Sequence, residues 1–245
     1  MEITFDIETR PCDDPDMIAD LTQQATAEAG EAADSVKAPA NYKDEAKIAE
    51  YISAKRAEIY AGAADSVAQK IAKTSLDGAY GRICCICWAI DDQPATGEIG
   101  GNEAEVIRLF FDAISDAAGI STHDGMVARP CTFIGHNITG FDLRFIWQRA
   151  VVLGIKRPSF IPFRAKPWDE RLKDTMVMWN PDREKRISLD RLCKVLGIKS
   201  PKGDLDGSKI AQAWADGRHD DIAHYCKADV DATRACWQKL TSSSA

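Results

Sequence analysis

The amino-acid sequence predicts an α/β protein with a mixed sheet flanked by helices. Apolar segments rich in β-branched residues stand at residues 1–7 and 82–90, and helical segments alternate with further short strands after them. With 245 residues, of which 45% are hydrophobic, the chain is long enough to bury one substantial core. We therefore expect one domain spanning residues 1–245.

The first predicted strand, residues 1–7, is followed by breaking residues at Pro11 and Pro15. Because alternate side chains of a strand share a face, Asp6 and Glu8 point to the same side of the sheet. Such a pair can hold a divalent metal ion.

Residues 17–74 are rich in Ala, Glu, Lys and Gln, and apolar residues recur among them at helical spacing. Pro39 divides this segment into two helical stretches. We interpret residues 13–78 as a helical insertion. Its helices either cap an active site, mediate assembly or simply pack on the sheet, and the sequence leaves this open.

The core elements resume at the strand of residues 82–90. Turn signals at Asp91 and Pro94 predict a hairpin into a strand that ends near Ile99. Asn102 can cap a helix through Ala118.

A short strand at residues 131–134 then places His136 and Asn137 at a strand end, a frequent location for functional residues. Further elements are predicted in the following order: a helix after Asp142, a strand at residues 173–179, a helix at 188–196, a helix from about 206 and a helix at 220–240.

Four carboxylates occur in three ordered motifs. The first holds Asp6 and Glu8, the second runs from Gly135 to Asp142, and in the third Tyr225 and Asp229 are four residues apart. On a helix this spacing places the phenol one turn from the carboxylate.

Each motif alone also has a structural interpretation. The Asp-x-Glu pattern recurs at residues 182–184, and residues 137–142 resemble a helix start with Thr139 as its cap. Three motifs in order favour a site.

The motifs resemble ExoI, ExoII and ExoIII of the DEDD (DnaQ-like) 3′–5′ exonucleases, which include polymerase proofreading domains, RNase D and RNase T. The stretch from Asp174 to Thr233 is most similar to stand-alone exonucleases related to the family B DNA polymerase proofreading domain. The resemblance covers about residues 1–10 and 80–240, and it implies an RNase H-like fold with a mixed five-stranded sheet. The insertion departs from the family, in which a short turn follows the first strand.

The resemblance implies phosphodiester hydrolysis with two Mg²⁺ ions, for which Mn²⁺ can substitute. Asp6, Glu8 and Asp229 would bind the ion that activates water. Asp6 and Asp142 would serve the second ion and the substrate, and Tyr225 would position the attacking water. The candidate substrate-binding residues are Thr9, His136, Asn137, Phe141 and Arg144, although His136 and Asn137 can equally form hydrogen bonds within their loop.

One branch of the family uses Tyr four residues before the final Asp, and the other uses His five residues before it. This chain has both, as His224 and Tyr225. On a continuous helix Tyr225 lies about 40° from Asp229 and His224 about 140° away, which favours the tyrosine (DEDDy) branch.

The net charge of −7 is unevenly distributed. Residues 144–202 hold 15 Lys and Arg against 6 Asp and Glu, a local balance of +9. This segment is predicted to contact phosphates, with aromatic side chains as stacking surfaces, or else to be a solvated basic face. The candidate residues are Arg144, Arg149, Lys156, Arg157, Arg164, Lys166, Arg171 and Lys173, with Phe160, Phe163 and Trp168 between them.

The eight cysteines lack metal-binding spacing and are expected to be reduced thiols in a cytoplasmic protein. No apolar run is long enough to span a bilayer, so no membrane partner is expected. Single-stranded DNA 3′ ends are the expected substrate, with a polymerase or replication partner in trans. An RNase D-like or oligoribonucleotide exonuclease is the alternative, and a non-hydrolysing nucleic-acid-binding module is the third hypothesis.

Overall fold

The computed structural model describes residues 1–119, 129–166, 168–181, 185–201 and 203–242. Residues 182–184, with the second Asp-x-Glu pattern, lie outside this part. The chain divides into two compact units, which we call the core unit, Met1–Arg10 with Arg82–Ala245, and the insertion unit, Pro11–Gly81. None of the helices within the described residues combines the length and apolar content needed to cross a membrane.

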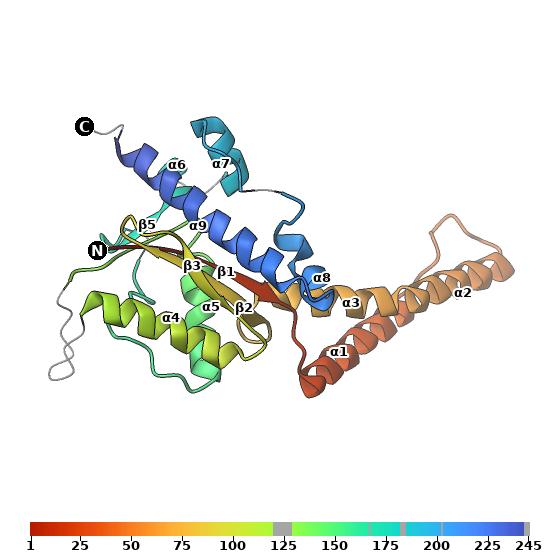
Figure 1. The fold of residues 1–245 in the computed structure, drawn as a ribbon. Helices are drawn as coiled ribbons and strands as arrows, with labels where there is room; N and C mark the ends of the chain where they lie inside the picture. The colour runs from red at the N-terminus through yellow and green to blue at the C-terminus, as the bar shows by residue number, and fades with distance from the viewer. Residues whose placement is uncertain (120–128, 167, 182–184, 202, 243–245) are drawn as a thin grey trace. The chain divides into compact units, whose positions relative to one another are not determined.

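The core unit is built on a mixed five-stranded sheet of order β3-β2-β1-β4-β5 (Figure 1). The β1–β2 and β2–β3 pairs are antiparallel, whereas β1–β4 and β4–β5 are parallel. The strands are β1 (Glu2–Arg10), β2 (Arg82–Ile90), β3 (Thr96–Ile99), β4 (Thr132–Gly135) and β5 (Leu172–Asp174). The predicted fold class is confirmed.

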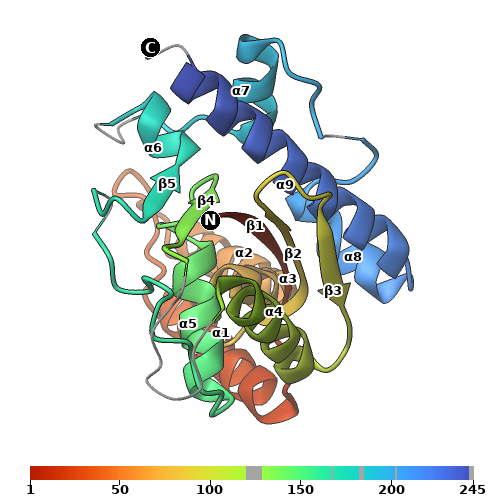
Figure 2. The ribbon, with the colours of Figure 1, turned by 60° about the vertical axis from the view of Figure 1, so that its left-hand side comes forward.

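Helices cover both faces of this sheet (Figure 2). One face packs against α4 (Glu103–Ala118) and α5 (Asp142–Val152), and the other packs against α8 (Ile210–Ala215) and α9 (His219–Ser242). The smaller core-unit elements are α6 (Thr175–Trp179), α7 (Leu189–Leu196) and the 3₁₀ turn η2 (Gly207–Lys209).

The side chains of β1 alternate between these two faces. Ile3, Phe5 and Ile7 are buried in the cluster shared with α4 and α5. Asp6 and Glu8 therefore point to the face that α9 covers, as the period of two predicts. The apolar half of the strand holds it in the core and determines the direction of its two acids.

Two predicted elements differ from the structure. The strand predicted over residues 173–179 is wrong beyond Asp174, because that carboxylate caps a short helix by accepting hydrogen bonds from Met176 N (3.1 Å) and Val177 N (3.4 Å). The helix predicted from residue 206 begins as the turn η2, which Asp206 caps, and becomes α-helical only at Ile210.

The insertion unit consists of three helices and a short turn rather than two helical stretches. A break between Asp34 and Glu45 surrounds Pro39, and a second lies at Gly62. Asp14 and Asp44 cap the first two helices. The elements are α1 (Pro15–Asp34), α2 (Glu45–Ala61), α3 (Ala63–Lys73) and the 3₁₀ turn η1 (Thr74–Leu76).

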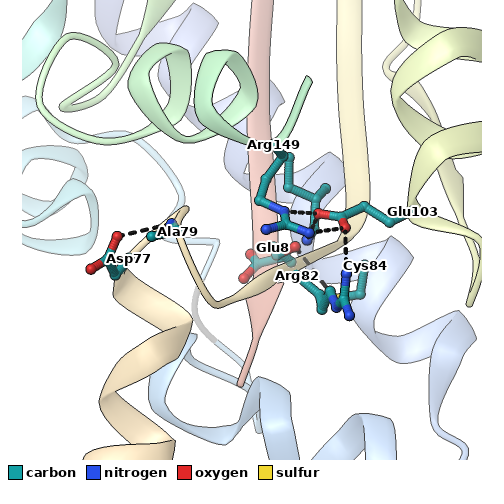
Figure 3. Close-up of polar contacts among 8 residues, drawn as sticks. Glu8, Asp77, Ala79, Arg82, Cys84, Glu103 and Arg149 are labelled. Carbon is teal, nitrogen blue, oxygen red and sulfur yellow. Dashed lines mark hydrogen bonds and ion pairs between the residues drawn. The ribbon is translucent and has the colours of Figure 1, made fainter. Parts of the chain in front are cut away.

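Arg149 does not belong to an exposed basic track, because it is 1% exposed. Its guanidinium donates two hydrogen bonds of 2.8 Å to Glu103 (Figure 3). Glu103 also accepts one from Ile83 N. This pair joins α5 to α4 and β2 inside the core unit. The expected phosphate contact at Arg149 is therefore wrong.

Candidate functional site

Asp6 and Glu8 lie on the C-terminal half of β1, opposite Cys87 and Cys85 of β2. Glu8 is buried and Asp6 is half-buried. Their carboxylate oxygens and the thiol of Cys226 on α9 lie within 4.8 Å of one another. The two acids of the first motif thus face the final helix.

Asp142 contacts β1 at the edge that does not pair with β2. Strand β4 pairs with β1 only as far as Thr4, and the chain then turns away into the loop that precedes α5. Beyond Thr4 this edge of β1 has no neighbouring strand among the described residues. There Asp142 Oδ1 accepts a hydrogen bond from Ile7 N at 3.2 Å. Asp142 is buried at the first residue of α5.

Helix α9 adds Tyr225 and Asp229 from one of its faces. Asp229 is buried, and the half-buried Tyr225 lies one helical turn before it. His224 is exposed and lines a 220 Å³ cavity together with Tyr225 and Asp204. Asp231 also points away, and it pairs with Arg234 at 2.8 Å.

The four carboxylates act on one another electrostatically. Burial, and then the charges of Asp142, Asp229 and Glu8, raise the pKa of Asp6 well above its ordinary value. Burial and the charge of Asp229 also raise the pKa of Glu8. The pKa of Asp142 rises to about 7, mainly by burial, against the lowering effect of its backbone hydrogen bonds. The structure therefore gathers the predicted acids from three distant segments.

Without metal, these raised pKa values predict lower stability at higher pH. The folded chain holds protons that the unfolded chain releases, so folding stability is highest below the unfolded pKa values and falls as pH rises through the folded ones, about 7 for Asp142. In EDTA, we expect the melting temperature to be lower at about pH 8 than at about pH 5. Thermal melts will test this. Asp142→Asn should flatten the difference, and an unchanged profile in that variant would contradict the assignment.

The donor set fits a hard divalent cation. Carboxylate oxygens are the ligands that Mg²⁺ prefers, and Mg²⁺ retains water alongside them. Buried acids that raise one another's pKa gain most from a bound positive charge. Cys226 is a softer donor, and its thiol instead lies 3.5 Å from the Asp6 carbonyl and 3.7 Å from Asp6 Oδ2. All eight cysteines are free thiols.

The loop of the second motif is held by Asp174, a residue that the sequence analysis did not select. Its buried carboxylate accepts hydrogen bonds from Asn137 N (3.0 Å), Thr139 N (3.3 Å) and Thr139 Oγ1 (2.8 Å). Thr139 therefore does not cap α5, which has no side-chain cap. Asn137 adopts a left-handed conformation with φ of 63°, which its contact with Asp174 helps to maintain.

We expect Asp174→Ala to reduce both stability and turnover. The change removes a cap from α6 and the anchor of the loop that leads into Asp142, so a loss of about 1–2 kcal/mol in stability should accompany a roughly tenfold lower kcat. Asn102→Ala is the matched control, since Asn102 caps α4. Thermal melts and single-turnover rates will measure the two effects. Equal activity in both variants would mean that Asp174 only caps a helix.

The candidate substrate-binding residues differ in their surroundings. Both ring nitrogens of His136 form hydrogen bonds within the protein, at 2.9 Å to Thr175 Oγ1 and to the Ile187 carbonyl. Burial lowers the pKa of His136. Phe141 packs on Phe145, with ring centroids 5.4 Å apart. Thr9 is half-buried on β1, and Arg144 is exposed on the first turn of α5.

Comparison with known proteins bears on the fold and the family of the chain. The structure is similar to that of the family B DNA polymerase from the hyperthermophilic archaeon Pyrobaculum calidifontis, with a TM-score of 0.53 and 20% sequence identity. The match covers 67% of this chain and only 22% of the polymerase chain.

A search of curated proteins gave no match. The family model described as "Predicted 3'-5' exonuclease related to the exonuclease domain of PolB" matches residues 76–244, well over half of the sequence. The chain therefore belongs to this DnaQ-like family of predicted 3′–5′ exonucleases related to the exonuclease domain of PolB.

Proposed function

We propose that this protein removes nucleotides from the 3′ ends of single-stranded DNA by metal-dependent hydrolysis. The observation that carries the proposal is the convergence of Asp6, Glu8, Asp142 and Asp229 at one largely buried position beside the half-buried Tyr225. A structural role alone does not account for it, because clustered carboxylates destabilise a fold that binds no cation.

The four carboxylates would hold two Mg²⁺ ions, with Mn²⁺ as a substitute. When bound, such a pair supplies an activated water and stabilises the leaving 3′ oxygen. Asp6, Glu8 and Asp229 would bind the ion on the side of the attacking water. Asp142, anchored to Ile7 N, would orient the second ion and the scissile phosphate.

Tyr225 would position the attacking water rather than deprotonate it. Burial and the charges of Asp229 and Glu8 raise the pKa of its phenol, so the hydroxyl keeps its proton at neutral pH. A protonated phenol can orient water through hydrogen bonds but is not a general base. We therefore propose that the chain belongs to the tyrosine (DEDDy) branch.

Digestion of end-labelled oligonucleotides tests the activity. With Mg²⁺, 5′-labelled single-stranded DNA should give a ladder of shortened products, while a 3′ label should appear at once as mononucleotide. EDTA should stop both reactions. Labelled RNA in parallel would identify an RNase D-like or oligoribonucleotide activity, because a preference for RNA requires contacts to the 2′-hydroxyl. No product from any substrate would contradict the proposal.

A related proposal concerns partners. A family B-like exonuclease acting in trans can supply a polymerase with a trimmed 3′ end, so a replication or repair protein is the proposed partner. Co-elution of the purified proteins and faster removal of a mismatched 3′ nucleotide by the mixture would support it. Unchanged removal would contradict it.

Tyr225→Phe distinguishes the two branches of the family. The change removes the hydroxyl but keeps the ring, so kcat should fall by about 10²-fold with KM little changed. The exposed neighbour His224 is the matched control, and His224→Ala should retain activity. Steady-state kinetics will measure both variants. The opposite result would assign the enzyme to the histidine branch.

A further inference from the structure

A second polar cavity lies along α5 and the segment that follows it, away from the four acids. It has a volume of about 730 Å³. The residues that give it chemical character are Trp147, Arg157, Arg164, Lys166, Asp169 and Arg171. We call these six residues the basic pocket.

The basic pocket is cationic within an acidic chain. It contains four positive side chains and one carboxylate, whereas the whole chain carries −7. Asp169 is already satisfied by Arg171, through hydrogen bonds of 3.0 Å and 2.8 Å. Within the described residues, no carboxylate forms an ion pair with Arg157, Arg164 or Lys166, and all three are exposed. The surface therefore presents uncompensated charge that suits a polyanion.

Aromatic surface accompanies this charge. The guanidinium of Arg164 lies 5.3 Å from the ring centroid of Trp147, so a flat stacking surface borders the cations. Nearby in sequence, Trp168 is 79% exposed. By contrast, the half-buried Phe160 and Phe163 pack on Phe133 and Phe111 at the margin of the core, although Phe163 also lines the cavity. The exposed indole of Trp168 and the half-buried indole of Trp147 lie among these cations, and cations beside indoles are the combination that binds phosphates and unpaired bases together.

The position of the basic pocket suits a strand that extends from the acids. Trp147 follows Asp142 by five residues on α5, about 7.5 Å along the helix axis and about 140° around it. A short substrate at the acids would not reach around the helix, whereas a longer strand can.

We propose that the basic pocket binds single-stranded nucleic acid several nucleotides upstream of the 3′ end. The proposal rests on the proposed exonuclease function and adds to it a second point of contact. Arg157, Arg164 and Lys166 contact successive phosphates, and Trp147 and Trp168 stack on bases. Long substrates are then held while the 3′ end is hydrolysed.

The test separates binding from hydrolysis. Binding of fluorescent oligo(dT) of about 20 nucleotides is measured by anisotropy in EDTA across salt concentrations. Hydrolysis of a dinucleotide with Mg²⁺ measures the activity of the four-carboxylate site alone, because this substrate is too short to reach the basic pocket. The variant Arg157→Gln/Arg164→Gln/Lys166→Gln removes three charges of the pocket. The matched control, Lys43→Gln/Lys47→Gln/Arg108→Gln, removes three exposed charges elsewhere.

The pocket variant should bind the long oligonucleotide at least about tenfold more weakly, with the salt slope reduced by about 2. Dinucleotide hydrolysis and the melting temperature should not change. Trp168→Ala should weaken binding by about fivefold or more, because it removes stacking without removing charge. Equal losses in the pocket variant and its control would overturn the proposal.

Two further outcomes are distinguishable. If the wild-type protein binds the oligonucleotide but hydrolyses no substrate, and the pocket variant binds it more weakly, the proposed exonuclease function fails and the binding role of the basic pocket stands. If oligo(dT) does not bind but polyglutamate does, the pocket proposal is overturned in favour of an acidic protein partner.

Discussion

Replacing any one of Asp6, Glu8, Asp142 and Asp229 by its amide is expected to reduce 3′-end hydrolysis by on the order of 10³-fold or more, about 4 kcal/mol of transition-state stabilisation. The amides keep the shape of the side chains but lose the negative charge that would hold a divalent cation. Hydrolysis of 5′-labelled single-stranded DNA will measure the loss.

The matched control is Asp231→Asn on the same helix as Asp229, because Asp231 is exposed and paired with Arg234. This variant should retain full activity. Each active-site amide should also raise the melting temperature in EDTA, since it relieves repulsion among the acids. Full activity in Asp6→Asn would contradict the assignment of the site.

The second large effect is expected for stability. Arg149→Met removes both hydrogen bonds of the buried pair and leaves Glu103 with the longer ion pair to Arg82, at 3.7 Å, so the free energy of unfolding should fall by about 3 kcal/mol. Adding Glu103→Gln should recover part of this loss, because the amide can still accept the hydrogen bond from Ile83 N. Urea denaturation will measure both variants.

Arg171→Met is the comparison for this experiment. It breaks an ion pair of similar geometry with Asp169, but Arg171 is 53% exposed and should contribute no more than about 1 kcal/mol. Equal losses at Arg149 and Arg171 would mean that burial does not determine the strength of the Glu103 pair.

Elements with local signals were predictable from the sequence. Helix α4 begins after Asn102 and ends at Ala118 as predicted, because a capping side chain and an apolar stripe are both visible in the sequence. Residues 173–179 were not predictable in this way. A short apolar run suits a strand or a helix equally, and the cap by Asp174 decides between them.

Contacts between residues far apart in the sequence account for the remaining differences between the predictions and the structure. The direction of Asp6 and Glu8 follows from strand alternation, and the spacing of Tyr225 and Asp229 follows from helical geometry. The role of Asp174 depends on donors 35 and 37 residues earlier, and the burial of Arg149 depends on Glu103, 46 residues earlier. Neither pairing leaves a pattern in a single sequence.

The connection between β1 and β2 has a consequence for folding kinetics. These strands pair from Arg10 and Arg82 onward, yet all of Pro11–Gly81 lies between them. Closing a loop this long instead of a short hairpin costs roughly 2–3 kcal/mol more in chain entropy. Within the insertion unit, Cys12 N donates to Thr74 Oγ1 at 2.8 Å, so helices that form early would shorten the loop. During synthesis, Asp6 and Glu8 emerge first but meet Asp229 only after α9 has been made, so the site is completed late in folding.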